Sequence, residues 1–314
     1  YRMSREIREA FPSVKQVVLM NEGPESTGAF RNTVDYEEFL SAGDASFCWP
    51  EIDERWAAAM CYTSGTTGKP KGVVYSHRSA MVHTLVAGLA ATMGLLESDV
   101  VMYAVPMFHA NGWGMPYLAA MVGASQVFSD RFLDADRVIN LLDSEGVTVS
   151  AGVPTVWTPV LNTLNTTGRR LPKLRRILCG GSAVPPFLIE GFRRQGIQMV
   201  HAWGMTETSP LGSMSTLKAS METWPDEKKL AVLSKQWIIA PMVECRIVEL
   251  ETGRELPWDG ASFGELQVRG PYITGGYYRD PEGQERFVEG WLRTGDVATI
   301  DPDGYIQLVD RTKD

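Results

Sequence analysis

The chain has 314 residues, of which 44% are hydrophobic and 22% charged, so it is long enough for two domains or one large α/β unit. Its formal net charge of −8 argues against an extended nucleic-acid surface, because such a surface needs many cations to neutralise phosphates. The four cysteines form no Cys-x-x-Cys pair, which disfavours both a zinc site and a disulfide framework. Reduced thiols in a cytoplasmic protein are therefore expected.

Strands and helices alternate in the first part of the chain. The predicted strands lie at residues 16–20, 57–62, 72–75 and 100–105. Ser76 or Ser79 can cap a helix over residues 78–96. Its apolar part is interrupted by His83 and Thr84 and is too short to span a bilayer. No transmembrane segment is predicted.

From residue 134 onward, single helices separate single strands. Helices are predicted at residues 134–145, from Pro154, and at 185–195, and strands at 147–151, 176–179 and 198–202. This alternation predicts parallel strands with right-handed crossovers. Further strands, joined by turns, are predicted at residues 243–249, 263–269 and 304–309. We expect an α/β fold of layered parallel sheets with helices over residues 1–239, followed by a smaller, mainly β subdomain over residues 240–309.

A glycine-rich loop occupies residues 62–73, between two of the predicted strands. Glycines let successive backbone N–H groups approach an anion, and the hydroxyls and lysines of the loop add further donors. The loop is therefore predicted to hold phosphate, with a flexible polar linker as the alternative. It is not a Walker A loop, because Pro70 stands where the second glycine of that pattern belongs.

The order Ser-Gly-Thr-Thr-Gly-Lys-Pro-Lys-Gly in this loop resembles the signature of the adenylate-forming superfamily, which contains acyl-CoA synthetases, luciferases and peptide-synthetase adenylation domains. The resemblance implies ATP as a substrate, with its β- and γ-phosphates held by the loop. The nucleotide-binding residues implied are Thr63, Ser64, Gly65, Thr66, Thr67, Gly68, Lys69 and Lys71.

A second motif, Ala-Trp-Gly-Met-Thr-Glu-Thr, follows a predicted parallel strand, where open α/β sheets bind ligands. It resembles the family's aromatic-Gly-x-Thr-Glu signature. The match implies that adenine stacks on Trp203 beside Gly204, although core packing is the alternative for this tryptophan. It also implies that Thr206 contacts the α-phosphate and Glu207 binds Mg²⁺, with Thr63 as a second metal contact. One carboxylate and one hydroxyl suit Mg²⁺, which keeps several waters.

The turn Gly-Gly-Ser-Ala-Val-Pro at residues 180–185 resembles the family's turn beside the adenine and acyl pocket. It implies nucleotide contacts at Gly181 and Ser182 and a contact of Gly180 with the acyl tunnel. Ser182 is not expected to be a nucleophile, because Val184 stands where a hydrolase elbow needs glycine.

Two motifs near the end of the chain resemble the remaining nucleotide contacts of the family. Trp-Leu-Arg-Thr-Gly-Asp, at residues 291–296, implies that Asp296 accepts hydrogen bonds from both ribose hydroxyls, with a plain turn as the alternative. Residues 310–314 resemble the start of a hinge linker to a small C-terminal domain. Arg311 would contact ribose or the α-phosphate, and Lys313 would sit at the hinge.

The segment Pro-Met-Phe-His-Ala-Asn-Gly-Trp resembles the signature that sets the substrate class. A histidine at the position of His109 lies beside the reacting carboxylate in this family; a structural histidine is the alternative. Ala110 and Asn111 stand where peptide-synthetase domains carry an aspartate for an amino group. A carboxylate with an apolar tail is therefore implied.

An acyl tunnel is implied by the same segment. Trp113 aligns with the tryptophan that closes the tunnel in medium- and long-chain fatty acyl-CoA synthetases, and an ordinary buried aromatic is the alternative. Gly112, Gly180 and Met205 are the other tunnel residues implied. The charged, amphipathic insertion over residues 215–235 resembles the same branch.

The resemblance implies a fatty acid–CoA ligase that joins a fatty carboxylate to the α-phosphorus of Mg-ATP and then passes the acyl group to coenzyme A. The catalytic residues implied are His109, Thr206, Glu207 and Arg311, acting by positioning and charge neutralisation. An aryl or other acid–CoA ligase and a fatty acyl-AMP ligase are alternatives in the family. A catalytically silent nucleotide-binding module is the alternative from another class.

We expect the chain to be part of a longer protein, since the family's adenylation lysine belongs to the small C-terminal domain, and to be a poor catalyst alone. The expected partners are a fatty acid, ATP and coenzyme A, without nucleic acid. A basic cluster at residues 169–176 leaves open a peripheral membrane contact of a cytoplasmic protein. A homodimer is likewise left open.

Overall fold

The computed structural model describes residues 12–20, 33–63, 69–129, 133–236 and 238–311. The chain divides into two compact units, Tyr1–Ile52 and Asp53–Asp314, which are described separately. In the first unit, strand β1 (Val17–Leu19) pairs in parallel with β2 (Thr33–Asp35), and helix α2 (Tyr36–Ser41) follows directly. The strand predicted at residues 16–20 is thus confirmed as β1.

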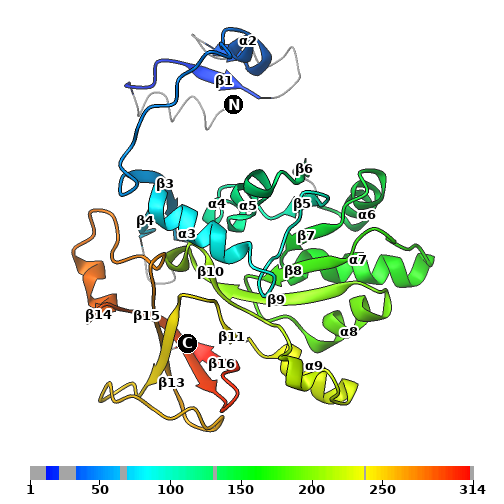
Figure 1. Cartoon of the computed structure of the whole chain (residues 1–314), viewed down its shortest axis with the longest axis vertical. Coiled ribbons are helices and arrows are strands. Elements are labelled where there is room, and N and C mark those ends of the chain that lie inside the picture. The colour runs from blue at the N-terminus through cyan, green and yellow to red at the C-terminus, as the bar shows by residue number, and fades with distance from the viewer. Residues whose placement is uncertain (1–11, 21–32, 64–68, 130–132, 237, 312–314) are drawn as a thin grey trace. The chain divides into compact units, whose positions relative to one another are not determined.

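A seven-stranded sheet forms the centre of the second unit, with the strand order β11-β10-β9-β8-β7-β5-β6 (Figure 1). Its strands are β5 (Val100–Ala104), β6 (Ser125–Phe128), β7 (Val149–Gly152), β8 (Arg176–Gly180), β9 (Gln198–Gly204), β10 (Leu211–Met214) and β11 (Ile238–Ile239). Strands β5 to β9 are parallel, as predicted, because a helix returns the chain between most successive strands. The antiparallel edge formed by β10 and β11 was not predicted.

The helices of this unit are α3 (His77–Ala87), α4 (Ala110–Trp113), α5 (Met115–Val122), α6 (Ala135–Ser144), α7 (Pro154–Thr167), α8 (Pro186–Arg194) and α9 (Asp226–Ser234), with short 3₁₀ turns η1 (Thr206–Thr208), η2 (Ala219–Met221) and η3 (Glu282–Arg286). Ser76 caps α3, as one of the two predicted candidates, by accepting a hydrogen bond from the Ser79 N–H. The prediction that this helix reaches residue 96 is wrong. The Thr92 hydroxyl donates to carbonyls of the last turn, so the chain folds back after Ala87. Within the described ranges, no helix has the length and apolar character that crossing a bilayer requires.

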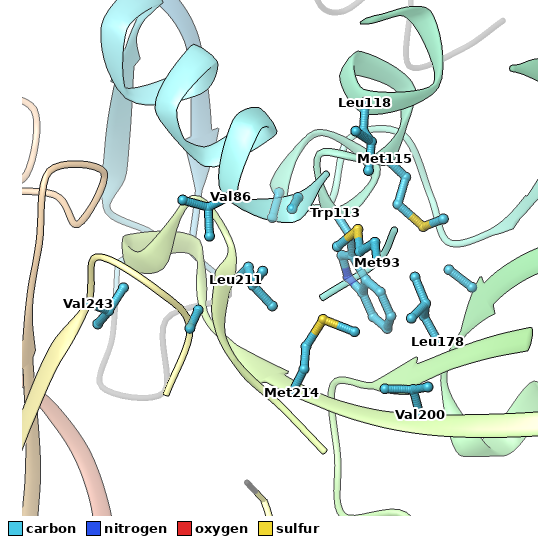
Figure 2. Close-up of a cluster of buried hydrophobic side chains, with 14 of the residues drawn as sticks. Val86, Met93, Trp113, Met115, Leu118, Leu178, Val200, Leu211, Met214 and Val243 are labelled. Carbon is cyan, nitrogen blue, oxygen red and sulfur yellow. The ribbon is translucent and has the colours of Figure 1, made fainter. Parts of the chain in front are cut away.

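Two hydrophobic cores lie on opposite faces of the sheet, because successive side chains of a strand point to opposite sides. One core packs α6, α7 and α8 against residues such as Met102 and Ile177. The other core takes Tyr103 and Leu178 from the same strands and joins them to α3, α5 and the antiparallel sheet described next. Figure 2 shows part of this second core, in which the cavity described below lies.

An antiparallel sheet follows, with the order β12-β13-β15-β14 and β16 paired to β15. Its strands are β12 (Glu244–Val248), β13 (Phe263–Arg269), β14 (Phe287–Val288), β15 (Trp291–Ile300) and β16 (Ile306–Arg311). The three strands predicted here are confirmed, but β14 and the ten-residue β15 were missed. The division into domains at residues 239 and 309 stays a prediction.

The predicted strands on either side of the glycine-rich loop are confirmed as an antiparallel pair, β3 (Ala57–Tyr62) and β4 (Gly72–Ser76). The loop itself is described only at its two ends, since residues 64–68 lie outside the described residues. Thr63 and Lys71 hold these ends together, because the Thr63 N–H donates to the Lys71 carbonyl at 2.9 Å.

Candidate functional site

A cavity of about 860 Å³ opens where the parallel strands β8 and β9 end and the antiparallel sheet begins. Ligands of open α/β sheets bind at this edge. Many of the predicted site residues line the cavity, namely Thr63, Lys69, Lys71, His109, Trp113, Gly180, Gly181, Ser182, Trp203, Gly204, Met205, Thr206, Glu207 and Asp296. Residues as far apart in the chain as Thr63 and Asp296 therefore meet at one site.

The turn after β8 leaves space for the cavity because its residues are small. A Cβ added at Gly180 would stand 2.3 Å from the carbonyl oxygen of Ala202, so no larger residue fits between β8 and β9 there. The turn is fixed by His201, whose Nε2 accepts a hydrogen bond from the Val184 N–H at 3.2 Å. Burial lowers the pKa of His201 to about 4, so this imidazole is neutral and can accept.

Trp203 and Asp296 are joined directly. The indole N–H of Trp203 donates to Oδ2 of Asp296 at 3.0 Å. A Cβ at Gly212 would stand 2.2 Å from Cζ3 and 2.4 Å from Cε3 of the indole, so this edge of the ring packs closely on the glycine. Since Trp203 also lines the cavity, its ring is a surface on which a planar base can stack. The predicted adenine and ribose contacts thus lie side by side.

The Glu207 side chain is buried and held by two partners. The Tyr277 hydroxyl donates to its Oε1, and Nη1 of Arg286 lies 3.5 Å from the same oxygen. The segment is fixed on its other side by Tyr75, whose hydroxyl donates to the carbonyl of Thr206 at 2.6 Å. Both contacts of the carboxylate use Oε1, which leaves Oε2 for a further ligand as far as the described residues go.

Glu207 and Thr63 fit a hard divalent cation such as Mg²⁺, because both present oxygen atoms to the same cavity. The nearby Arg286 guanidinium makes a buried carboxylate tolerable without a bound cation. The two residues could therefore contribute the carboxylate and hydroxyl expected of such a site.

Lys71 points toward the same group of side chains. Its Nζ forms an ion pair with Asp280 at 3.0 Å and lies 5.0 Å from the centre of the Tyr277 ring. A Cβ at Gly283 would come within 3.1 Å of all three of these side chains, so they pack closely around this glycine. Lys71 and Glu207 therefore share one supporting residue, Tyr277.

His109 and Trp113 are carried by an unusual turn. Residues 110–114 all have positive φ, from 41° at Ala110 to 71° at Gly114, so α4 is a left-handed turn. The side-chain amide of Asn111 holds this turn in place. Its Oδ1 accepts a hydrogen bond from the Cys61 thiol, and its Nδ2 donates one to the Tyr117 hydroxyl at 2.6 Å. The turn places His109 and Trp113 at the cavity, where the predicted acyl site lies.

The tunnel prediction does not fit Gly112. This residue is not among those that line the cavity, and a Cβ there would meet Met107 and Pro116. Its small size serves the left-handed turn instead.

Residues 3–278 match the family of AMP-binding enzymes. The chain belongs to this family. The predicted superfamily and its fold are thereby confirmed.

Two curated relatives and one solved structure illustrate the family's range. The chain is 43% identical over 312 residues to a 3-methylmercaptopropionyl-CoA ligase from Ruegeria lacuscaerulensis, and 43% identical over 311 residues to a long-chain-fatty-acid–CoA ligase from Thermus thermophilus. In each match 98% of this chain is covered, but only 57% and 56% of the relative. The o-succinylbenzoate coenzyme A synthetase of Bacillus subtilis, solved with ATP and magnesium, has a TM-score of 0.75 and 25% identity, with coverage of 100% of this chain and 63% of that one.

The structure describes the C-terminal end of the chain as far as Arg311. Arg311 is the last residue of β16, and its Cα lies opposite Asp296 in the ladder with β15. The backbone therefore brings Arg311 to the cavity edge that carries the predicted ribose contact. Lys313, like Ser64, Gly65, Thr66, Thr67 and Gly68, lies outside the described residues.

Several cavity residues were missed by sequence reasoning. Besides Arg286, these are Glu265 of β13 and Arg293 of β15, which pair at 2.7 Å between Oε2 and Nε. Glu265 could have been found from the sequence, because it stands among the apolar residues of a predicted strand and a buried carboxylate needs a cationic or hydrogen-bonding partner. Tyr277 and Asp280 carried no local signal, because their role depends on a loop that closes over distant segments.

The basic cluster of residues 169–176 does not form one uniform surface. Arg175 pairs with Asp99 at 2.6 Å, and Arg176 is partly buried and donates to the carbonyl of Met93. Arg169 donates to the side chain of Asn140 at 2.9 Å. Fewer cations than the sequence suggests therefore point freely into solvent.

Proposed function

We propose that this chain supplies the nucleotide and acyl sites of a fatty acid–CoA ligase. The observation that carries the proposal is the Trp203–Asp296 contact, which brings a stacking surface and a diol acceptor together in the cavity that Glu207 and His109 also line. The names of both curated relatives, which are CoA ligases for carboxylic acids, support the same chemistry.

In this proposal the nucleotide lies between Trp203 and Asp296, and Lys69 and Lys71 meet the phosphates that leave as pyrophosphate. Thr206 contacts the α-phosphate, and Arg311 approaches it or the ribose from β16. Glu207 and Thr63 would hold Mg²⁺, which neutralises charge on the phosphate oxygens. The protein needs no nucleophile, because in-line attack by the substrate carboxylate requires positioning and charge stabilisation only.

The carboxylic acid lies on the opposite side of the cavity. His109 lies beside its carboxylate, and Trp113, Gly180 and Met205 line the space for its tail. No amino-recognising carboxylate stands at Ala110 or Asn111, in keeping with a simple acid. The acyl group of the resulting adenylate would then pass to coenzyme A.

The proposal is tested by fatty-acid-dependent exchange of labelled pyrophosphate into ATP. We expect weak exchange with this chain and strong exchange with a longer chain that carries the C-terminal domain. ATP binding without exchange in the longer chain would point to a silent nucleotide-binding module instead.

A second candidate, a ligase for other acids, is favoured by the relative named for 3-methylmercaptopropionate. A panel of fatty, aryl and thioether acids separates the two candidates. Comparing coenzyme A with a carrier-protein thiol as acceptor tests the fatty acyl-AMP ligase.

A cytoplasmic location, a homodimer and peripheral contact of residues 169–176 with a membrane stay proposals. Co-sedimentation with anionic liposomes should weaken when Arg169 and Arg170 become Glu. Unchanged binding would reject the membrane contact.

A further inference from the structure

Arg286 lines the large cavity, and the proposed function gives it no role. It is the last residue of η3 and directly precedes β14, which pairs with β15 (Figure 1). Its guanidinium lies between two parts of the proposed nucleotide site that come from different segments of the chain. One part is Glu207, the proposed metal carboxylate, and the other is the segment of β15 that carries Asp296, the proposed ribose acceptor.

On the ribose side, Arg286 holds the backbone of β15 where the strand leaves its regular pairing. The register with β13 shifts there, and residues 294–296 form a bulge. Nε and Nη2 of Arg286 donate to the carbonyl of Arg293 at 3.2 and 3.0 Å, and Nη2 also donates to the carbonyl of Thr294 at 2.7 Å. The Asp296 N–H in turn donates to the Thr294 hydroxyl at 3.1 Å. Arg286 therefore fixes the backbone that presents Asp296 to the cavity.

On the metal side, the same guanidinium supports Glu207. Its Nη1 donates to the Tyr277 hydroxyl at 3.1 Å and lies 3.5 Å from Oε1 of Glu207. The Tyr277 hydroxyl donates to that same oxygen. A planar guanidinium, with donors on three nitrogens, makes all of these contacts at once, whereas a lysine ammonium is a single point of charge. One side chain thus connects the ribose site with the metal carboxylate.

The positive charge of Arg286 has a second consequence for the metal. A cation bound to Glu207 would share its carboxylate with the guanidinium, and the two positive charges would repel one another across a short distance. The side chain of Glu207 is 4% exposed and that of Arg286 31%, so solvent screens this repulsion only in part. Phosphates bound in the cavity would supply the negative charge that offsets both cations. Mg²⁺ is therefore expected to bind more readily with the nucleotide than alone.

We propose that Arg286 is a positioning residue that joins the ribose site to the metal carboxylate, and that its charge disfavours Mg²⁺ until the phosphates of the nucleotide are bound. The inference deepens the proposed function and rests on it for the roles of Glu207 and Asp296. It predicts opposite changes for two ligands when the guanidinium is removed. The metal alone binds more tightly, and the nucleoside binds more weakly. A residue that only stabilised the fold would weaken the binding of both.

The first measurement is Mn²⁺ binding to this chain without nucleotide, by electron paramagnetic resonance. Arg286→Met should bind Mn²⁺ about fivefold to tenfold more tightly than the native chain, and Arg286→Lys, which keeps the charge, should change the affinity less than about twofold. With a non-hydrolysable ATP analogue bound, the gain of Arg286→Met should fall below about twofold, since phosphate oxygens then hold the metal. Weaker or unchanged Mn²⁺ binding without nucleotide, or a full gain that persists with the analogue, overturns the role of the charge.

The second measurement is adenosine binding without metal, by calorimetry. Arg286→Met and Arg286→Lys should both lose about tenfold in affinity, because neither side chain makes the paired bonds to the β15 carbonyls. 2′,3′-Dideoxyadenosine lacks both hydroxyls from which Asp296 would accept, so it should bind the native chain and the two variants equally. Equal losses for both nucleosides would contradict the positioning of the ribose acceptor.

Arg279→Met is the matched control, because it removes the same charge from the same connection between β13 and β14. Arg279 is exposed, lies 5.1 Å from the centre of the Tyr278 ring and is not among the residues that line the cavity. It should leave both affinities unchanged, and a change as large as that of Arg286→Met would overturn the proposal. Arg286→Gln, which removes the charge but keeps donors, serves if Arg286→Met does not fold.

The outcome in the native chain separates this inference from the proposed function. A native chain that binds no adenosine would refute the proposed function and the role of Arg286 together. A native chain that binds adenosine and Mn²⁺, with neither affinity altered in the Arg286 variants, would refute the role of Arg286 alone.

Discussion

The large cavity has two unlike walls. An apolar wall of Met93, Trp113, Gly180, Gly181 and Ala202 comes from the ends of parallel strands and the segments packed on them. A charged wall comes from strands β13 and β15 and from the short turns η1 and η3; its residues are Glu207, Glu265, Arg286, Arg293 and Asp296.

The difference follows from how each wall is built. On the apolar wall, small residues let two backbones approach, so the space depends on main-chain geometry. On the charged wall, long side chains reach across between strands and satisfy one another, as Glu265 and Arg293 do. Substitutions in the charged wall should therefore change nucleotide chemistry, and those in the apolar wall should change stability and the choice of acid.

The largest loss of activity is expected from a substitution of Glu207. Glu207→Gln removes the buried negative charge and should slow adenylate formation about 100- to 1,000-fold, by analogy with other lost electrostatic contacts at active sites. Pyrophosphate exchange measures the rate, and electron paramagnetic resonance with Mn²⁺ measures metal affinity. Glu285→Gln changes an exposed carboxylate of the same cavity and should have little effect. Similar losses of exchange rate and Mn²⁺ affinity in both variants would contradict a specific role of the buried Glu207 carboxylate.

A smaller effect is expected at Tyr277, which positions Glu207 without facing the substrate itself. Tyr277→Phe keeps the ring beside Lys71 but removes the hydroxyl that donates to Glu207. It should weaken Mn²⁺ affinity and exchange about tenfold, the usual cost of losing an outer-shell partner. Tyr278→Phe alters the exposed neighbour and is the control. Unchanged Mn²⁺ affinity in Tyr277→Phe would remove its positioning role.

Behind the apolar wall, Asn111 in the turn that carries Trp113 should matter for the stability of the fold. Asn111→Gly loses the bonds to Cys61 and Tyr117 but accepts the positive φ, whereas Asn111→Ala loses the bonds and strains the backbone. Urea denaturation should show Asn111→Ala less stable than Asn111→Gly by about 1 kcal/mol. Equal stabilities would mean that the turn relaxes out of its left-handed form.

The smallest effect on the site is expected from a substitution of Asp99, which directly precedes β5. Burial alone would raise its pKa, but hydrogen bonds from Arg175, Thr148 and the Leu96 N–H outweigh it and lower the pKa below the ordinary value. A lowered pKa means that the charged form stabilises the fold above about pH 4 and that this contribution is lost as pH falls through the folded-state pKa. Asp99→Asn should cost about 1–3 kcal/mol at pH 7 by thermal denaturation, with the difference shrinking at acidic pH, and leave ligand affinities unchanged. A pH-independent difference would contradict this assignment.

The apolar wall was more predictable than the charged one. Strand β8 and its glycine turn show local periodicity and composition, and these patterns depend on neighbours in the sequence. Strand β15 was missed because Thr294, Gly295 and Asp296 have turn composition. In the structure, Glu265 pairs with Val297 and Gln267 with Arg293, so these three residues form a bulge within the strand.

That bulge also explains how Asp296 reaches Trp203. An interrupted register redirects a side chain, and no sequence pattern specifies the direction. The hydrogen-bond partners of Glu207 could not be predicted from the sequence for a related reason. Tyr277 is 70 residues away along the chain, so its hydrogen bond to Glu207 forms only when the chain has folded.

The close approach of Gly180 to Ala202 has a consequence for how relatives of this chain can diverge. Any side chain at Gly180 would push β8 and β9 apart, since its Cβ would lie 2.3 Å from a carbonyl oxygen. Evolution toward shorter or longer acids is therefore expected to leave this glycine in place. Met93, which lines the same cavity from outside the strands, is a position where a change of side-chain volume would leave β8 and β9 in place.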